Sequence, residues 1–96
     1  MFDLHRKIAA ITGGGSGIGR AIAILFAKEG ADIAILYLNE HNDAKDTRSL
    51  VTDTYGRRCI LIDGDIGDEK FCRTAVKKVK EKFGRIDILI NNAAMH

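Results

Sequence analysis

The feature that most constrains this chain is the glycine-rich segment at residues 12–19, which reads TGGGSGIG. It joins the short apolar run at residues 8–12 to a segment of helical periodicity that begins at Gly17. A tight loop at the start of a helix exposes backbone N–H groups beside the positive end of the helix dipole, and these bind a pyrophosphate. The alternative is an ordinary tight turn or a flexible linker, although an amphipathic helix rarely follows a linker at once.

The spacing of the glycines excludes two common phosphate-binding patterns. No choice of first glycine gives GxGxxG, because the segment reads TGxxxGxG. It is not a GxxxxGK[ST] loop either, since Arg20 follows Gly19 and the chain has no Lys-Ser or Lys-Thr pair. We therefore do not expect mononucleotide hydrolysis.

The hydrophobic pattern alternates between strand and helix along the chain. Apolar runs predict strands at residues 8–12, 33–38, 59–62 and 86–90. Helical periodicity predicts helices at residues 17–28 and 42–55, and a third helix that Asp68 caps and Gly84 ends. Right-handed crossovers between such units predict an α/β fold, a doubly wound parallel sheet with helices on both faces.

Two of the predicted helices carry apolar residues at helical spacing, which we expect to face the sheet. In the first helix these residues are Ile18, Ala21, Ile22, Leu25 and Phe26. In the third helix they are Phe71, Ala75, Val76, Val79 and Phe83. The middle helix is more polar and offers Ala44, Leu50 and Val51 to a core.

The length and net charge of the chain limit the number of domains and the classes of partner to expect. Ninety-six residues suffice for one small core, so we expect residues 1–96 to form part of a single domain. No apolar stretch approaches the ~20 residues that cross a bilayer, and the charged residues 1–7 lack a secretory apolar region. These features predict a cytoplasmic protein without a membrane partner. A net charge of +2 gives no support for nucleic-acid binding.

The two cysteines do not suggest a metal site. Cys59 and Cys72 are not in a CxxC arrangement and have no histidine nearby, so we expect no metal and interpret both as reduced packing residues. The four lysines near the end of the third predicted helix complement its dipole, which favours a solvated face over a nucleic-acid patch.

A second motif completes a family resemblance. The TGxxxGxG loop after the first strand, together with Asn91-Asn92-Ala93-Ala94 after the fourth, resembles the short-chain dehydrogenase/reductase family. The stretch Tyr37-Leu38-Asn39-Glu40 is similar to the glucose-dehydrogenase-like bacterial branch. The resemblance covers nearly the whole chain and implies the N-terminal, dinucleotide-binding part of a Rossmann-type domain, with four strands in the order 3-2-1-4. The fourth strand would lie at an edge and expose Ile86, Ile88 and Ile90.

By that resemblance, the glycine loop lies along the adenosine and pyrophosphate of a nicotinamide cofactor, Asp65 accepts a hydrogen bond from the adenine, and Ile66 packs on the ring. Asp65 has an alternative role as a turn or capping residue, and the Asn-Asn pair could simply end a strand. Ala94 departs from the family's usual glycine, which puts the geometry of that turn in doubt. The implied cofactor-binding residues are Gly13, Gly15, Ser16, Gly17, Ile18, Gly19, Tyr37, Leu38, Asn39, Asp65, Ile66, Asn91 and Ala93.

The end of the second predicted strand bears on the choice of cofactor. A carboxylate there hydrogen-bonds the ribose hydroxyls and repels a 2′-phosphate, but this chain has Tyr37. The positions of the family's usual basic clamp, Ser16 and Leu38, are uncharged. Asn39, Glu40, Lys45 and Arg48 are the remaining polar candidates. The pattern leaves both NAD and NADP open and leans to NADP.

The resemblance implies an NAD(P)-dependent oxidoreductase that transfers hydride between the nicotinamide and a small alcohol or carbonyl substrate, in a dimer or tetramer. The family's catalytic serine, tyrosine and lysine would lie beyond residue 96. Neither Tyr37 nor Tyr55 has a lysine four residues later, so we expect the chain alone to be inactive. The alternatives are a non-catalytic dinucleotide-binding or regulatory module and a truncated or misassembled gene product.

Overall fold

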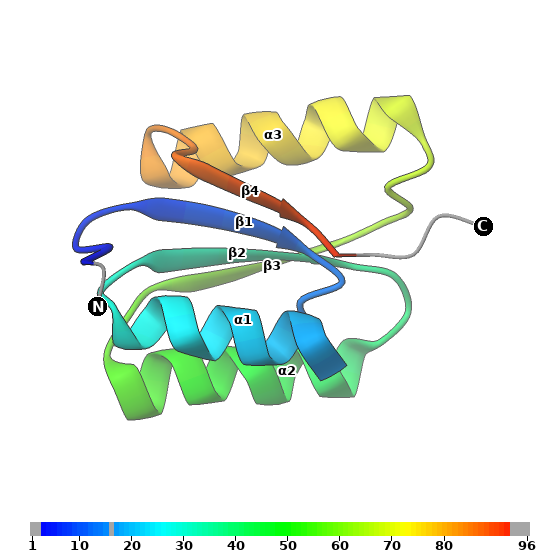
Figure 1. The fold of residues 1–96 in the computed structure, drawn as a ribbon. Helices are drawn as coiled ribbons and strands as arrows, with labels where there is room; N and C mark the ends of the chain where they lie inside the picture. The colour runs from blue at the N-terminus through cyan, green and yellow to red at the C-terminus, as the bar shows by residue number, and fades with distance from the viewer. Residues whose placement is uncertain (1–2, 16, 93–96) are drawn as a thin grey trace.

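A computed structural model describes residues 3–15 and 17–92 and shows one parallel sheet (Figure 1). Its strands are β1 (Ile8–Thr12), β2 (Asp32–Tyr37), β3 (Cys59–Asp63) and β4 (Ile88–Asn91). They lie in the order β3-β2-β1-β4. The predicted α/β fold with the strand order 3-2-1-4 is therefore confirmed.

Helices cover both faces of the sheet. The helix α1 (Gly17–Lys28) and the helix α2 (His41–Ser49) lie on one face, and α3 (Glu69–Phe83) lies on the other (Figure 1). A short π-helical turn, η1 (Leu50–Thr54), continues α2, so the predicted helix at residues 42–55 is one helix with a wider last turn. Among the described helices, none has the length and hydrophobicity needed to cross a membrane.

The two inner strands form the core of the molecule. Every residue of β1 and β2 is buried, because each strand pairs on both sides and helices cover both faces. Many of the buried side chains are small, which lets the helices approach the sheet closely. The buried alanines are Ala9, Ala10, Ala23, Ala27, Ala31, Ala34, Ala44 and Ala75.

The ends of α3 agree with the prediction. The Asp68 side chain caps the helix by accepting a hydrogen bond from the Lys70 N–H at 2.9 Å. Gly84 ends it in the left-handed conformation with φ of 89°, and its N–H donates to the Lys80 carbonyl at 2.7 Å.

The helix faces differ in part from the expected stripes. In α1 the residues that contact the sheet are Gly19, Ala23 and Ala27, because the helix lies too close to β1 and β2 for larger side chains. Ile18, Ala21 and Leu25 are exposed instead, while Ile22 and Phe26 are half-buried against the core. In α3 the expected stripe is correct at Ala75 and Val79 but wrong at Val76, which is 42% exposed.

The edge strand β4 also differs from its prediction. It begins at Ile88 rather than at residue 86, because residues 85–87 form a connection in which Arg85 bonds Asp87. Ile88 and Ile90 point toward the α1 side and pack against the core, and Ile86 packs on the opposite side. The exposed apolar residue of this strand is Leu89, which is 65% exposed.

Candidate functional site

The candidate site lies where the four parallel strands end. Thr12, Tyr37, Asp63 and Asn91 are the last residues of β1, β2, β3 and β4. The order β3-β2-β1-β4 changes direction between β1 and β4, and ligands of open α/β sheets bind at the carboxyl ends beside such a switch. The sheet topology therefore brings the two sequence motifs to one edge.

The glycine loop turns sharply between β1 and α1. Gly13 has φ of 68°, and its N–H donates to the Leu36 carbonyl at 2.8 Å, which ties the loop to β2. Gly19 packs so closely that a Cβ there would overlap the Gly13 carbonyl oxygen. Only glycine meets both demands, a positive φ and a backbone in contact with a helix. The loop consequently presents main chain at the start of α1 with little side-chain cover.

Gly17 differs from Gly19 in the reason for which it favours glycine. A Cβ at Gly17 would meet nothing within 4 Å, and its φ of 56° is the feature that favours glycine. Ile18, the next residue of the same helix, is 72% exposed and so is available to a ligand. Ser16 lies outside the described residues, and its predicted cofactor contact stays a prediction.

The loop is fastened to α2 by two side chains that the sequence prediction missed. The Thr47 hydroxyl donates to the Gly15 carbonyl at 2.9 Å, and the Arg20 guanidinium donates to the same carbonyl at 3.1 Å. Arg20 also donates to the Thr47 hydroxyl at 2.9 Å and to the Asp43 carbonyl at 3.0 Å. Arg20 directly follows the TGxxxGxG motif, but nothing in the sequence indicates its partners on α2.

Thr12 connects the two motifs. Its hydroxyl lies 3.0 Å from the Asn91 side-chain oxygen and accepts the Asn92 N–H at 3.0 Å. The Asn92 side chain donates in turn to the Gly13 carbonyl at 3.3 Å. The turn after β4 and the first glycine of the loop are therefore held in one hydrogen-bonded unit. Ala93, the last predicted cofactor contact, lies outside the described residues.

A second polar group lies at the ends of β2 and β3. Tyr37 is only 8% exposed, and its hydroxyl lies 3.0 Å from His41 Nδ1. The other ring nitrogen of His41 lies 3.5 Å from the Asp63 carboxylate, which also accepts the Asn39 N–H at 3.3 Å. His41 and Asp63 were not among the predicted site residues, because Tyr37 ends β2 and His41 begins α2, so no helical spacing in the sequence relates them.

The chain after β3 holds the predicted adenine contact. The Asp65 carboxylate accepts the Gly67 N–H at 2.8 Å, and the Asp65 carbonyl accepts the Asp68 N–H at 3.0 Å. Asp65 thus fills the turn role that the sequence left open, and its side chain stays exposed. Ile66 is half-buried beside it and packs against the core under α3. Neither arrangement tests the adenine contact, which stays a prediction.

The chemical character of this edge is that of a binding surface. In the described ranges, 3–15 and 17–92, no group of three His, Cys, Asp or Glu side chains is arranged to hold a metal ion. Leu38, at 48% exposure, and Asn39, with φ of 64°, complete the predicted set at the end of β2. Main-chain donors and small residues at a helix start can hold a pyrophosphate, and the flanking polar groups can select what is attached to it.

Comparison with known proteins agrees with this geometry. The family profile described as short chain dehydrogenase matches residues 7–96. The uncharacterized oxidoreductase YhdF of Bacillus subtilis is 59% identical over 91 residues, which cover 95% of this chain and 31% of YhdF. The chain thus spans about a third of that relative's length.

Two solved structures show what similar proteins bind. A short chain dehydrogenase from Burkholderia cenocepacia in complex with NADP is 42% identical, with a TM-score of 0.91 over 98% of this chain and 38% of that one. Carveol dehydrogenase from Mycobacterium avium in complex with NAD is 31% identical, with a TM-score of 0.90 over 99% of this chain and 38% of that one.

Proposed function

The chain belongs to the short chain dehydrogenase family, and from this we propose that it binds a nicotinamide dinucleotide where its strands end, which we call the carboxyl edge of the sheet. The observation that carries the proposal is the hydrogen-bonded unit of Thr12, Gly13, Asn91 and Asn92, which joins the glycine loop to the turn after β4. The fit of Gly19 against Gly13 leaves main chain where a pyrophosphate approaches. When bound, the cofactor supplies or accepts the hydride.

Each predicted residue has a role in this proposal. The loop with Ser16 holds the pyrophosphate through its N–H groups, and the exposed Ile18 packs against the cofactor. The other contacts follow the strand ends, with Asp65 and Ile66 at the adenine and the remaining residues along the riboses, namely Tyr37, Leu38, Asn39, Asn91 and Ala93. The whole protein is then an oxidoreductase acting on a small alcohol or carbonyl compound.

We infer that NADP is accepted, because β2 ends in Tyr37 rather than in a carboxylate that would repel a 2′-phosphate. Similar proteins have been solved with each cofactor. The Asp63 carboxylate reduces the preference for NADP over NAD, since its negative charge lies beside this position, where it accepts the Asn39 N–H and lies 3.5 Å from the His41 ring. NADP is therefore the proposed cofactor, with NAD as a competitor.

The experiment compares two glycines that have nearly the same backbone strain at opposite ends of the sheet. Gly13 and Gly56 have φ of 68° and 65°, so a valine at either position has a similar backbone penalty, on the order of 1–3 kcal/mol. A Cβ at Gly56 meets nothing within 4 Å. Gly13→Val should weaken NADP binding by at least about a hundredfold, because it obstructs the pyrophosphate. The control variant Gly56→Val should leave NADP binding unchanged.

Binding is measured by calorimetry, and folding of each variant is checked by circular dichroism. Equal binding by the parent chain and a folded Gly13→Val variant would contradict the proposal. The same preparations should show no dehydrogenase turnover, since neither tyrosine has a lysine four residues later. Turnover that a substitution within residues 1–96 abolishes would overturn that part.

A further inference from the structure

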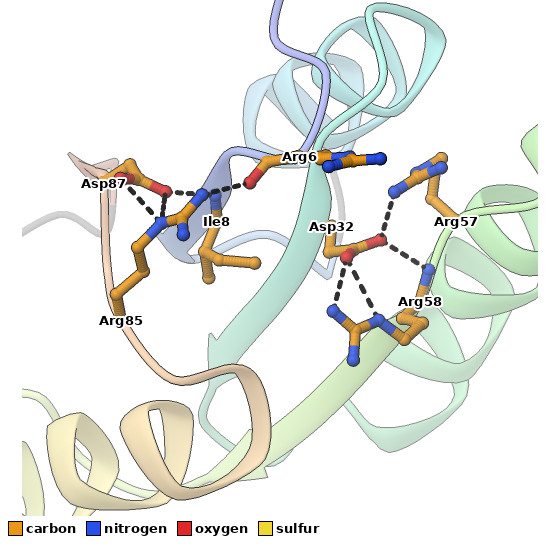
Figure 2. Close-up of polar contacts among 7 residues, drawn as sticks. All are labelled: Arg6, Ile8, Asp32, Arg57, Arg58, Arg85 and Asp87. Atoms are coloured by element: carbon orange, nitrogen blue, oxygen red, sulfur yellow. Dashed lines mark hydrogen bonds and ion pairs between the residues drawn. The ribbon is translucent and has the colours of Figure 1, made fainter.

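The opposite end of the sheet, where the strands begin and which we call the amino edge, carries a hollow rich in arginine. Its volume is about 330 Å³, at the lower end of the range for small-molecule sites. Except for Phe83, which ends α3, the lining residues lie where strands begin or just before them, at the opposite end of the strands from the glycine loop. Figure 2 shows the arginines and Asp32 of this hollow. They are Arg6, Ile8, Asp32, Arg57, Arg58, Phe83 and Arg85.

Asp32 is the centre of one half of this hollow. It is 3% exposed and accepts from Arg58 through the backbone N–H at 3.0 Å and the guanidinium at 2.8 and 3.0 Å. Arg57 makes an ion pair with the other oxygen at 2.9 Å. Burial acts to raise the pKa of Asp32, but the hydrogen bonds from Arg58 and the charge of Arg57 outweigh it and hold that pKa below its ordinary value. Asp32 is therefore a carboxylate surrounded by cations.

The other half is built on Asp87. Its carboxylate accepts the Ile8 N–H at 2.8 Å and the Arg85 Nε–H at 2.8 Å. Arg85 also donates to the Arg6 carbonyl at 2.6 Å, which brings the chain before β1 against the start of β4. Arg85 thus has two partners of its own, the Asp87 carboxylate and the Arg6 carbonyl.

The cations of this edge outnumber its carboxylates. Asp32 and Asp87 match two of the four guanidinium groups, so a surplus of two positive charges remains. Within residues 3–15 and 17–92 the Arg6 guanidinium has no carboxylate partner, and Figure 2 shows it pointing toward Arg57. Arg57 Nε is buried without a hydrogen-bond partner among the same residues. Two like charges and an unpaired buried donor at one hollow are unfavourable without an anion.

We propose that this hollow binds a phosphate group, as inorganic phosphate or as a small phosphate monoester, between Arg6 and Arg57. The planar guanidinium forks match phosphate oxygens with paired hydrogen bonds, and a dianion balances the two surplus charges. Arg58 is held in place by Asp32 and by the Phe83 ring, whose centroid lies 4.7 Å from its guanidinium carbon. The site is separate from the proposed cofactor loop, because the two lie at opposite ends of the strands.

The test is a titration with inorganic phosphate and with glycerol 2-phosphate, followed by NMR of the backbone and arginine Nε–H signals. Chloride at the same ionic strength is the blank, and saturating NADP occupies the carboxyl edge. We expect saturable shifts at the Nε–H groups of Arg6 and Arg57. Arg6→Gln and Arg57→Gln should each weaken binding about tenfold, as expected for a lost charged hydrogen bond. The matched control is Arg73→Gln, a 79% exposed arginine on α3.

Further titrations distinguish failure of the phosphate site from failure of the proposed cofactor binding. Repeating the titration with Gly13→Val should leave phosphate binding unchanged, whether or not that variant binds NADP. Shifts that chloride reproduces, or shifts confined to residues 12–19, would overturn the phosphate site. The Arg6 side chain is exposed, so we expect the Arg6→Gln variant to fold. If Arg57→Gln does not fold, the phosphate affinity of Arg6→Gln tests the site. Unchanged affinity in a folded Arg6→Gln variant would also overturn it.

Discussion

The carboxyl edge and the amino edge of the same four-stranded sheet are built from different groups. At the carboxyl edge, main chain is exposed by Gly13 and Gly19. Hydroxyl and amide groups hold most of it in place, and one guanidinium, that of Arg20, bonds the Gly15 carbonyl. At the amino edge, charged side chains do the same structural work, with Asp32 and Asp87 bonded by arginines. The two edges are the two ends of the same strands, so they differ in the types of residue that form their contacts.

The difference teaches that the two edges should respond to different perturbations. Neutral contacts to main chain depend on shape, so a single added methyl group disrupts them, whereas salt does not. Charged contacts tolerate small changes of shape but depend on a partner charge and, where exposed, on ionic strength. Substitutions that remove charge should therefore act mainly on the amino edge, and substitutions that change shape mainly on the carboxyl edge.

The largest effect should come from Asp32→Ala at the amino edge. It leaves Arg57 without a partner beside a buried position, and loss of one member of a buried ion pair lowers the free energy of unfolding by about 3–5 kcal/mol. We expect the lower value, about 3 kcal/mol, because Arg58 is 60% exposed and regains water. Urea unfolding followed by circular dichroism measures it. A loss below about 1 kcal/mol would show that the two edges do not differ as argued.

The same carboxylate predicts an acid response. The pKa of Asp32 is lowered in the folded chain, so its stabilisation is fully present above the unfolded value of about 3.9 and is lost as pH falls through the folded value. Asp32→Asn should therefore flatten the dependence of stability on pH below about 4. An unchanged slope in urea titrations across that range would contradict the assignment.

The next effect should come from Thr12→Val, which keeps the shape of the side chain but removes the link between the two motifs. The Asn92 N–H and the Asn91 side chain lose a partner, at a cost of about 1–2 kcal/mol in the free energy of unfolding. NADP affinity should fall as well, because the loop loses one of its anchors. Thr52→Val, whose hydroxyl bonds the Arg48 carbonyl on α2, is the control and should leave NADP affinity unchanged.

A smaller effect concerns the choice of cofactor. Asp63→Asn removes the carboxylate beside Asn39 and His41, and should raise the preference for NADP over NAD about fivefold. Asp53→Asn, on η1, removes an equal charge away from this edge and should change nothing. Tyr37→Asp should shift preference toward NAD, but it also buries a charge, because Tyr37 is 8% exposed. A preference that Asp63→Asn leaves unchanged would exclude Asp63 from this role.

The smallest effect should come from Arg73→Gln on α3, which belongs to neither edge. Its pair with Glu69 is exposed at both ends, so its loss should change the free energy of unfolding by at most about 0.5 kcal/mol. Thermal unfolding of parent and variant in parallel checks this. A change comparable to that of Asp32→Ala would mean that exposed charges matter as much as the buried carboxylate.

The carboxyl edge was largely predictable from the sequence, because its signals are local. The glycines of the loop are consecutive or nearly so, Asn91 ends a clear apolar run, and Asp65 lies in the turn that follows another. The periodicity of α1 was equally clear, but it did not show that small residues rather than Ile18 and Leu25 face the sheet. That choice depends on how closely the helix approaches β1 and β2, which is a property of the assembled layers.

The amino edge was not predictable, because its contacts join distant residues. Asp32 and Arg58 are 26 positions apart, and Ile8 and Asp87 are 79 apart. In the sequence these residues look like ordinary polar positions between elements, and only the pairing of parallel strands brings them together. The clamp of Arg20 and Thr47 on the Gly15 carbonyl was missed for the same reason, since its residues are 27 positions apart.

The pairing of β1 with both β2 and β4 also sets an order of assembly. Ile11 pairs with Ile35 through one short crossover, whereas its partner in β4 is Ile90, at the far end of the described chain. Closing the longer loop costs about 1 kcal/mol more chain entropy. We expect the three strands β1, β2 and β3 to associate first and β4 to dock last, with the Thr12 link formed only then. Weakening that link should accelerate unfolding and leave the refolding rate nearly unchanged.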